Sequence, residues 1–381
     1  MKSNPFIYFD NNATTSCAKE VILAMEKEIR LGPSNPSSIH KFGREAKKRL
    51  YRARSHIASY LNVFPSELVF TSGGTESLNL VIRGFAHLGD IITTKIEHAS
   101  LYNTVRLVKS EDQIHYVEVD EKGVATIEAI QSKITPKTKL LILSAVNSET
   151  GAMLNLEAIA QLAENESLIL IIDGVALLGK EAFTIPSGVS AMVFSAHKFH
   201  GPKGVGFHYI NEFAPPIKSF QVGGSQESTK RAGTENLLGI MGLEAAILRL
   251  QFKQLDITNH LLNLRTRFEN SIFEQIKGCK VNGSSKRVCN TSNIFFEDID
   301  AETLLILLDQ NNIMASHGSA CSSGALEPSR VLLNMGYSKK RAKQSIRFSF
   351  SVDNTMEEVD IVIKTLSSII TQMRKNLTLV K

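Results

Sequence analysis

The sequence has no tryptophan, only four cysteines and no apolar run of about 18 residues or more. The cysteines (Cys17, Cys279, Cys289 and Cys321) are too few in 381 residues for a disulfide framework, and no CxxC pair occurs. This spacing argues against a zinc ribbon or a thioredoxin-like redox motif, and we expect no metal site. The first residues lack the apolar core of a signal peptide. We therefore expect a cytoplasmic protein with reduced thiols and no membrane partner.

The chain also has little net charge. Its 43 Lys and Arg residues against 38 Asp and Glu residues give a formal charge of +5, which favours neither nucleic acid nor an anionic membrane as a partner. The hydrophobic fraction of 43% and charged fraction of 21% are typical of globular proteins. A chain of 381 residues is long enough for two or three domains.

From residue 66 onward, short β-rich runs alternate with helical stretches. The expected strands are 68–71, 91–94, 114–119, 140–146, 168–173, 192–196 and 206–210. The main helical stretches between them are 75–88, 100–109 and 156–165. Several of the runs are apolar throughout, as in strands whose two faces are both covered by helices. The pattern predicts an α/β fold with a mainly parallel, seven-stranded, doubly wound sheet.

The ends of the chain have a different organisation. Helices are expected at 18–31 and 42–61, and after residue 236 at 237–249 and 260–275. A strand-and-helix segment follows, with runs at 292–296, 303–309 and 346–350. We predict a large domain of residues 12–250 and a smaller α+β domain that joins residues 1–11 to residues 251–381.

One polar cluster lies where a predicted strand passes through a glycine turn into a helix. Ligands of open α/β sheets bind beyond the carboxyl ends of the strands. The run Thr71-Ser72-Gly73-Gly74-Thr75-Glu76-Ser77 presents backbone N–H groups and hydroxyls there, and these could bind a phosphate. It matches neither GxxxxGK[ST] nor GxGxxG, so nucleotide binding is not indicated. A plain capped helix with a flexible turn is the alternative.

Two further strand ends carry ionisable groups. Asp173 closes an apolar strand, where a carboxylate either reaches solvent, caps a helix or meets a cation such as a protonated pyridine nitrogen. The run Ser195-Ala196-His197-Lys198 ends another strand. A lysine there is either a solvated surface charge or a Schiff-base former whose amine is freed by partial burial. Together, the three clusters supply the parts needed to bind pyridoxal phosphate.

A fourth cluster surrounds Cys321, in a loop of small residues from Ser316 to Gly324. A cysteine in an exposed loop is an oxidation liability unless it has a function, whereas most free cysteines are buried. We therefore interpret Cys321 as a nucleophile. Cys17, Cys279 and Cys289 are expected to fill ordinary structural positions.

In this order along the chain, the clusters resemble the cysteine desulfurase family, the NifS/IscS-like group of fold-type I pyridoxal-phosphate enzymes. The resemblance covers almost the whole chain, and the long cysteine loop resembles that of the class with a mobile catalytic loop. The motifs that carry it are Tyr8-Phe9-Asp10-Asn11-Asn12-Ala13-Thr14-Thr15, Asn35-Pro36-Ser37-Ser38, the 70–77 turn, Glu97-His98, Ser195-Ala196-His197-Lys198, Gly223-Gly224-Ser225-Gln226-Glu227, Arg231-Ala232-Gly233-Thr234, Gly318-Ser319-Ala320-Cys321 and Leu326-Glu327-Pro328-Ser329.

The resemblance implies a role for each matching residue. Lys198 would hold the cofactor covalently and move the α-proton, Asp173 would pair with the pyridine nitrogen, and His98 would stack on the ring. The cofactor phosphate would be bound by Gly74, Thr75, Ser195 and His197, with Thr234 reaching across from a second subunit. Arg347, helped by Asn35, would bind the substrate carboxylate, and Cys321 would attack the substrate sulfur.

Two positions depart from the family pattern. The family usually has a Gln three residues after the strand-end Asp, where this chain has Ala176, and an Asn where this chain has Ser148. Both changes fall on the side of the cofactor's ring oxygen. A lost hydrogen bond of this kind costs about 0.5–1.5 kcal/mol. Neutral drift with intact activity is one explanation, and a changed substrate preference or a partner-dependent rate is the other.

The expected reaction is conversion of L-cysteine to L-alanine, with the sulfur left as a persulfide on Cys321. The resemblance also implies a homodimer and a sulfur-acceptor protein such as an iron–sulfur scaffold. A pyridoxal-phosphate aminotransferase or β-lyase of the same fold, which would not need Cys321, is the alternative activity. A weakly active, partner-dependent homologue or a scaffold protein derived from a desulfurase is a further possibility.

Overall fold

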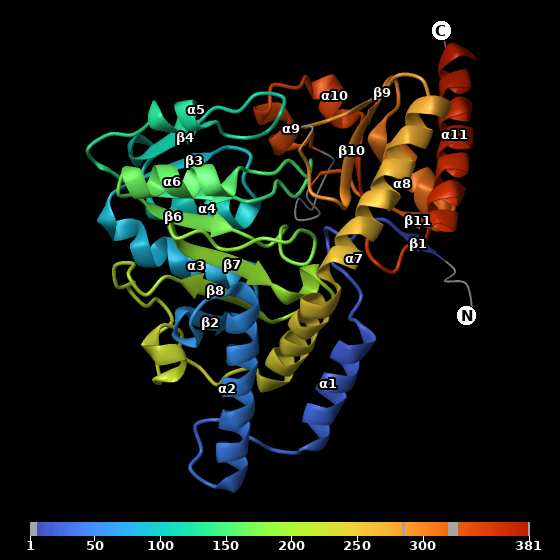
Figure 1. Ribbon diagram of the computed structural model, residues 1–381. Coiled ribbons are helices and arrows are strands. Elements are labelled where there is room, and N and C mark those ends of the chain that lie inside the picture. Colours follow the sequence, from blue (N-terminus) through green and yellow to red (C-terminus); the bar gives the residue numbers. More distant parts are fainter. Residues whose placement is uncertain (1–5, 284–285, 319–326, 380–381) are drawn as a thin grey trace.

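A computed structural model describes residues 6–283, 286–318 and 327–379 (Figure 1). The central sheet has seven strands in the order β2-β8-β7-β6-β5-β3-β4. Their bounds are β2 Leu68–Thr71, β3 Asp90–Thr94, β4 Ile114–Val117, β5 Thr138–Ser144, β6 Ile169–Asp173, β7 Val189–Ser195 and β8 Gly206–Ile210. The five strands from β7 to β4 are parallel, and β8 is antiparallel to both β7 and β2. The predicted fold class, with a mainly parallel seven-stranded sheet, is confirmed.

Helices cover both faces of this sheet because successive strand residues point to opposite sides. On one face, Leu140 and Ile142 of β5 pack with residues of α3 (Gly74–Phe85) and α4 (Ala99–Val108). On the other face, Leu141 and Leu143 join the core formed with α6 (Leu156–Asn165) and α2 (Lys41–Leu61). The central strands are therefore apolar on both sides.

A second, three-stranded antiparallel sheet has the order β12-β10-β9. Its strands are β9 Cys279–Val281, β10 Thr291–Phe296 and β12 Ser345–Ser349. The N-terminal strand β1 (Ile7–Tyr8) pairs in parallel with β11 (Ile313–Met314), so residues from the two ends of the chain lie side by side. The remaining helices are α1 Lys19–Arg30, α5 Ile127–Gln131, α7 Leu237–Gln275, α8 Ala301–Gln310, α9 Arg330–Asn334, α10 Lys339–Lys343 and α11 Met356–Leu379.

Helix α7 corrects one expectation from the sequence. The two helices expected at 237–249 and 260–275 are one continuous helix of 39 residues. Residues 250–259 contain neither Gly nor Pro, the residues that most often end a helix, so the polar residues among them do not interrupt it. Figure 1 shows α7 running from beside α1 and α2 to beside α11. The proposed boundary between residues 250 and 251 falls inside this helix, and the division into two domains stays a prediction.

Candidate active site

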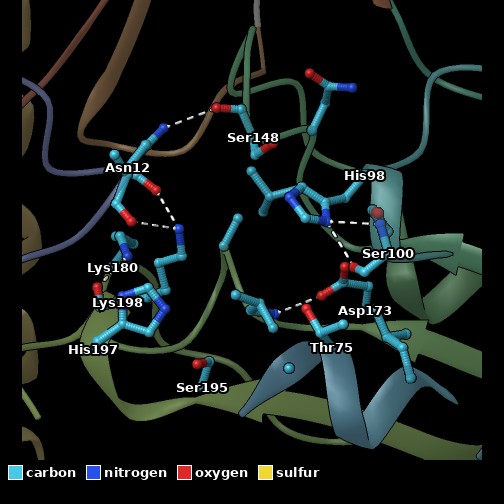
Figure 2. Close-up of a pocket in the computed structure, with 18 of the residues that line it drawn as sticks. Asn12, Thr75, His98, Ser100, Ser148, Asp173, Lys180, Ser195, His197 and Lys198 are labelled. Carbon is cyan, nitrogen blue, oxygen red and sulfur yellow. Dashed lines mark hydrogen bonds between the residues drawn. The ribbon is translucent and has the colours of Figure 1, made fainter. Parts of the chain in front are cut away.

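A cavity of about 210 Å³ opens at the carboxyl ends of the parallel strands, beside the small sheet. Most of the site residues predicted from the sequence line it. They are Gly74, Thr75, His98, Asp173, Ser195, His197, Lys198 and Arg347. Figure 2 shows Lys198 and Asn12 on one side of the cavity and His98, Ser100 and Asp173 on the other. The chain therefore brings its cationic, anionic and aromatic candidates into one enclosed space.

The glycine turn before α3 forms a cradle at one end of the cavity. Gly73 caps α3 with φ +153°, a backbone conformation open almost only to glycine, and the cap uses no side-chain hydrogen bond. A Cβ on the neighbouring Gly206 would lie 2.7 Å from the Cα of Gly73, so the two backbones approach closely. The first N–H groups of a helix have no partner within it, and the partial positive charge there attracts anions. This turn therefore fits a phosphate group.

The amine of Lys198 lies at the cavity wall beside the N-terminal segment. Lys198 ends the short 3₁₀ helix Ala196–Lys198 that follows β7. Its Nζ donates to the main-chain oxygens of Asn12, at 2.5 Å, and Ala13, at 2.9 Å. Both acceptors belong to the Tyr8–Thr15 motif near the N-terminus. The N-terminal segment therefore holds the amine at the cavity wall.

A second lysine, Lys180, holds the backbone that carries Lys198, and no sequence pattern indicated it. Lys180 is 4% exposed, and its Nζ donates to the main-chain oxygen of Lys198 at 2.6 Å. Burial, and then the charge of Lys198, lower the pKa of Lys180 to about 7. Lys180 therefore anchors the backbone that carries Lys198.

Replacing Lys180 by methionine should change how stability depends on pH. The folded-state pKa of about 7 lies below the ordinary 10.5, so between these pH values the unfolded chain binds more protons. The free energy of unfolding of the wild type should therefore rise with pH across this range, by up to about 1.4 kcal/mol per pH unit from this group.

Denaturant unfolding of the cofactor-free protein from pH 7 to 10 measures this. We expect the difference between wild type and Lys180→Met to change by about 2–4 kcal/mol over the range. The exposed Lys203→Met is the matched control and should follow the wild type. Parallel curves for wild type and Lys180→Met would show that Lys180 titrates as an ordinary lysine.

Asp173 is a buried carboxylate at the end of β6, 6% exposed. Its Oδ1 accepts a hydrogen bond from the N–H of Val175 at 3.0 Å. Burial raises the pKa of Asp173, whereas the positive charges of His98 and Lys198 oppose the rise. A buried carboxylate of this kind is stabilised by a cation, and the protonated pyridine nitrogen of pyridoxal phosphate fits that requirement.

His98 is oriented by Ser100, two residues later in the first turn of α4. The N–H of Ser100 donates to Nδ1 of His98 at 3.2 Å, and the Ser100 hydroxyl lies 2.7 Å from the same atom. Because a backbone N–H can only donate, Nδ1 is the acceptor, and a neutral His98 carries its proton on Nε2. The ring is thus fixed in one tautomer at the wall of the cavity.

His197 is neutral near pH 7. Burial first, and then the charge of Lys198, lower the pKa of His197 to about 4. Its Nδ1 lies 3.1 Å from the hydroxyl of Thr14. A neutral imidazole beside the glycine turn can donate one hydrogen bond to an anion without adding a positive charge.

Arg347 is buried in β12 and already holds a carboxylate. Its Nη2 lies 2.7 Å from Oδ1 of Asp10, and the side chains are 3% and 16% exposed. Its Nη1 donates to the main-chain oxygen of Ser148 at 3.1 Å. Among the described residues, Nε of Arg347 has no hydrogen-bond partner. This nitrogen is itself buried, so the N–H groups of Nη1 and Nη2 are the ones through which Arg347 lines the cavity.

Cys321 lies outside the described residues, but the chain on both sides of it is anchored beside the cavity. On one side, Ser316 and Arg347 exchange backbone hydrogen bonds of 3.1 and 2.7 Å. On the other, the Ser329 hydroxyl donates to Oε2 of Glu149 at 2.5 Å. Arg330 donates to the main-chain oxygen of Glu97, the residue before His98, also at 2.5 Å.

Two predicted site residues do not line the cavity of their own chain. Thr234 is exposed and lines a separate hollow with Ser72 and Arg231. Asn35 is exposed in the connection between α1 and α2, where its side chain accepts a hydrogen bond from the N–H of Ser37 at 2.9 Å. One chain therefore does not bring Asn35 together with Arg347.

The two positions that depart from the family pattern both line the cavity. Ala176 follows β6 and presents only a methyl group to it. The main-chain oxygen of Ser148 accepts hydrogen bonds of 3.1 Å from Asn12 and from Arg347. The hydrogen bond to Arg347 therefore comes from the backbone at residue 148 and does not depend on the side chain at that position.

The other cysteines differ in burial. Cys289 is buried and Cys279 is partly buried, as expected for structural positions. Cys17 is exposed, unlike most free cysteines, and its expected structural role stays a prediction. It precedes α1 on a loop that contacts Gly201, with its Sγ 3.6 Å from the Gly201 oxygen. The packing of that loop, which the sequence pattern does not reveal, leaves Cys17 at the surface.

Several contributors to the site were missed at the sequence level. Asp10, Asn12 and Ala13 belong to a motif that carried the resemblance, but neither composition nor spacing gave them a role. Ser100 could have been found from its position two residues after His98, at a helix start. Lys180 follows an apolar turn, and the sequence gives no sign that it is buried.

Two further findings concern metal binding and membrane crossing. Across residues 6–283, 286–318 and 327–379, no group of three or more His, Cys, Asp or Glu side chains is arranged to hold a metal ion. None of the helices in the described part of the chain combines the length and the apolar character needed to cross a membrane.

Comparisons with known proteins agree with this geometry. The family model described as "Aminotransferase class-V" matches residues 7–362. A protein from Clostridium botulinum named "Cysteine desulfurase IscS" is 37% identical over 382 residues, covering 98% of this chain and 96% of its own. Among solved structures, one titled "NIFS-LIKE PROTEIN" superposes with a TM-score of 0.89 at 32% identity, covering 96% of this chain and 99% of its own. Another, titled "SspA in complex with cysteine", has a TM-score of 0.80 at 28% identity, covering 91% and 99%.

Proposed function

The chain belongs to the cysteine desulfurase family of class V aminotransferases, and from this we propose that it removes sulfur from L-cysteine to give L-alanine, leaving the sulfur as a persulfide on Cys321. The observation that carries the proposal is the convergence of groups in one cavity. The Lys198 amine, the buried Asp173 carboxylate, the glycine turn of α3 and the buried Arg347 all line it. These groups fit pyridoxal phosphate together with an amino acid.

Each group then has a defined task. Gly74, Thr75, Ser195 and His197 would hold the phosphate group, and Asp173 would hold the pyridine nitrogen in its protonated form. When bound, pyridoxal phosphate supplies a sink for the electron pair left at the substrate α-carbon. Lys198 would anchor the cofactor and remove the α-proton, and His98, at the cavity wall, would assist proton transfer.

Arg347 binds and orients the substrate carboxylate. Because Asp10 and the Ser148 oxygen fix its two terminal nitrogens, the guanidinium is held in place before substrate arrives. The remaining N–H groups of Nη1 and Nη2 can then donate to a carboxylate with little loss of side-chain freedom. We propose that Asn35 contributes to this subsite from a second copy of the chain.

The sulfur step balances as a transfer between thiols. The Cys321 thiolate attacks the substrate sulfur, so a new S–S bond forms and the substrate C–S bond breaks. The bonding electron pair stays with the substrate β-carbon, which takes up a proton and becomes the methyl group of alanine. Two equivalents of an external thiol then reduce the persulfide: sulfide leaves, Cys321 is restored as a thiol, and the two external thiols are oxidised to a disulfide.

Product analysis tests the proposal. The protein is incubated with L-cysteine, pyridoxal phosphate and a reducing thiol, and alanine, sulfide and pyruvate are counted per active site. Several equivalents of alanine with equal sulfide are expected. Pyruvate in place of alanine would identify a β-lyase, and no product despite bound cofactor would point to the partner-dependent homologue.

Restoring the family's amide should tighten cofactor binding. Ala176 lines the cavity without a hydrogen-bonding group, so Ala176→Gln adds a donor. A gain of about 0.5–1.5 kcal/mol corresponds to a dissociation constant for pyridoxal phosphate lower by roughly 2- to 13-fold. Equilibrium dialysis measures it. Ala158→Gln, on α6 outside the cavity, is the matched control. If Ala176→Gln bound pyridoxal phosphate with unchanged affinity, this would contradict the prediction that residue 176 lies beside the ring oxygen of the cofactor.

We propose that the protein acts as a homodimer. Thr234 is exposed and lies outside the cavity of its own chain, where it could serve the cofactor site of a second copy. The surface between α1 and α2 also exposes large apolar side chains, with Ile39 90% and Phe42 61% exposed. Such side chains favour a protein contact over solvent.

The persulfide implies a partner that accepts its sulfur. We propose an acceptor protein such as an iron–sulfur scaffold, since a persulfide transfers its outer sulfur readily to another thiol. We further propose a cytoplasmic location, where thiols stay reduced. Cys17, Cys279 and Cys289 are free of disulfide bonds, in agreement with such a compartment.

A further inference from the structure

One carboxylate joins the glycine turn of the cofactor site to the loop that carries Thr234. Oε2 of Glu76 accepts a hydrogen bond from the N–H of Ser72 at 2.7 Å, which closes the turn that opens α3. Oε1 of the same carboxylate accepts from Nε of Arg231 at 2.8 Å. The two side chains are each 18% exposed. Glu76 thus contacts both segments at once.

The charge of Glu76 is maintained in this position. Burial opposes ionisation, but the hydrogen bonds from Arg231 and Ser72 prevail and hold the pKa of Glu76 below its ordinary value. The contact with Arg231 is therefore an ion pair at neutral pH. A partly buried, hydrogen-bonded pair is worth more than an exposed one.

A second buried ion pair holds the other end of the same loop. Glu227 pairs with Arg54 of α2, with Oε1 and Nη2 2.5 Å apart. Its Oε2 also accepts from the N–H of Phe70 in β2, at the edge of the central sheet, at 2.8 Å. Glu227, Ser228 and Thr229 all have positive φ, from +48° to +66°, an unusual conformation for residues with side chains. Such a conformation persists only where its surroundings hold it.

The two ion pairs fix Glu227 and Arg231, so the backbone that leads to Thr234 has little conformational freedom. Arg231 is three residues from Thr234, and both line the hollow on the outer side of the glycine turn, together with Ser72. The inner side of the same turn, at Gly74 and Thr75, lines the cofactor cavity. Glu76 therefore connects the turn that lines the cavity with the segment that leads to Thr234.

We propose that the Glu76–Arg231 ion pair couples the two cofactor sites of a dimer: an anion bound at Gly74 and Thr75 of one chain stabilises the surface on which that chain presents Thr234 to the other. This inference rests on the proposed function, because it requires the cofactor phosphate and the second copy. By linkage, dimer formation then strengthens phosphate binding by the same factor. Arg231 is a positioning residue here, since it acts through Glu76 and Thr234.

The test measures dimer dissociation by dilution of fluorescently labelled subunits, with and without saturating pyridoxal phosphate, and separately with inorganic phosphate. For the wild type, we expect the cofactor to lower the dimer dissociation constant at least 10-fold, and inorganic phosphate to reproduce part of that effect. Arg231→Met should bind the cofactor at saturation, but the ratio between the two dissociation constants should fall below 2-fold. Arg231→Lys, which keeps the charge, should recover part of the coupling.

Arg83→Met is the matched control. Arg83 lies on the same helix as Glu76 and stacks over the ring of Phe220, with its guanidinium 4.6 Å from the ring centre, but it is not part of the ion pair. Arg83→Met should keep the wild-type ratio of the dimer dissociation constants without and with the cofactor, even if its dimer is weaker. Glu76→Gln provides a second route should Arg231→Met not fold, and it should also lose the coupling.

The outcomes separate this inference from the proposed function. The coupling alone is overturned if the wild type binds the cofactor and dimerises, and Arg231→Met or Glu76→Gln shows the wild-type ratio of dimer dissociation constants without and with the cofactor. A wild-type dimer that does not respond to the cofactor overturns it as well. A wild-type protein that binds no cofactor, or stays monomeric at all concentrations, overturns the proposed function and the inference with it.

Discussion

Replacing Lys198 by methionine is expected to abolish alanine formation. The amine of Lys198 is held at the cavity wall by the oxygens of Asn12 and Ala13, and no other lysine amine described in the cavity has that position, because Lys180 points into the backbone behind it. Loss of a general base alone costs about 10²–10⁴-fold in rate. Loss of the cofactor anchor adds to this, so turnover should fall by about 10⁴-fold or more.

Two measurements check this result. One is the rate of alanine formation at saturating pyridoxal phosphate. The other is mass spectrometry after borohydride reduction, which should find the cofactor on the peptide that contains Lys198 in the wild type and on no peptide in Lys198→Met. Lys203→Met, an exposed lysine in the same turn, should retain both properties. A labelled peptide elsewhere would place the anchor on another lysine.

Replacing Cys321 by serine should have a comparable effect on turnover while leaving substrate binding intact. Serine cannot accept sulfur as a persulfide, so alanine formation should fall by about 10³-fold or more. Arg347 and Lys198 are unchanged, so the absorbance change that L-cysteine produces in the holoenzyme should remain.

The control for this variant is Cys17→Ser. Cys17 is an exposed cysteine in the described part of the chain, and its replacement should leave the rate of alanine formation unchanged. Persulfide on the Cys321 peptide, detected by alkylation and mass spectrometry after one turnover, completes the measurement. Normal turnover by Cys321→Ser would show that sulfur leaves by another route.

The sequence predicted the sheet and most of the cavity wall for one physical reason. In a parallel sheet, the residues that follow neighbouring strands meet at one edge, so Asp173 after β6 and Lys198 after β7 could be placed together from the strand pattern alone. Strand β2 is separated from β7 by the antiparallel β8, but it runs in the same direction as β7, so the glycine turn after β2 reaches the same edge. These predictions need only the periodicity of apolar residues and the position where it ends.

Other parts of the site depend on contacts between distant segments, which no local pattern encodes. The pairing of Asp10 with Arg347 joins residues 337 positions apart, and the buried Lys180 contacts the distant residues Lys198 and Cys289. Thr234 and Asn35 lie outside the cavity of their own chain, so a single chain could not have revealed their neighbours. The unbroken course of α7 was missed because polar residues in its middle resemble a boundary.

That helix has a consequence for the geometry of the substrate. With 39 residues and a rise of about 1.5 Å per residue, α7 is roughly 58 Å long. It packs on α1 and α2 near one end and on α11 and β10 of the small sheet near the other. One continuous helix therefore links the part of the molecule that carries Lys198, after β7, with the small sheet that carries Arg347. An amino acid bound in the cavity would bridge these two groups with its α-carbon and its carboxylate, so the distance between them selects for the backbone of an amino acid.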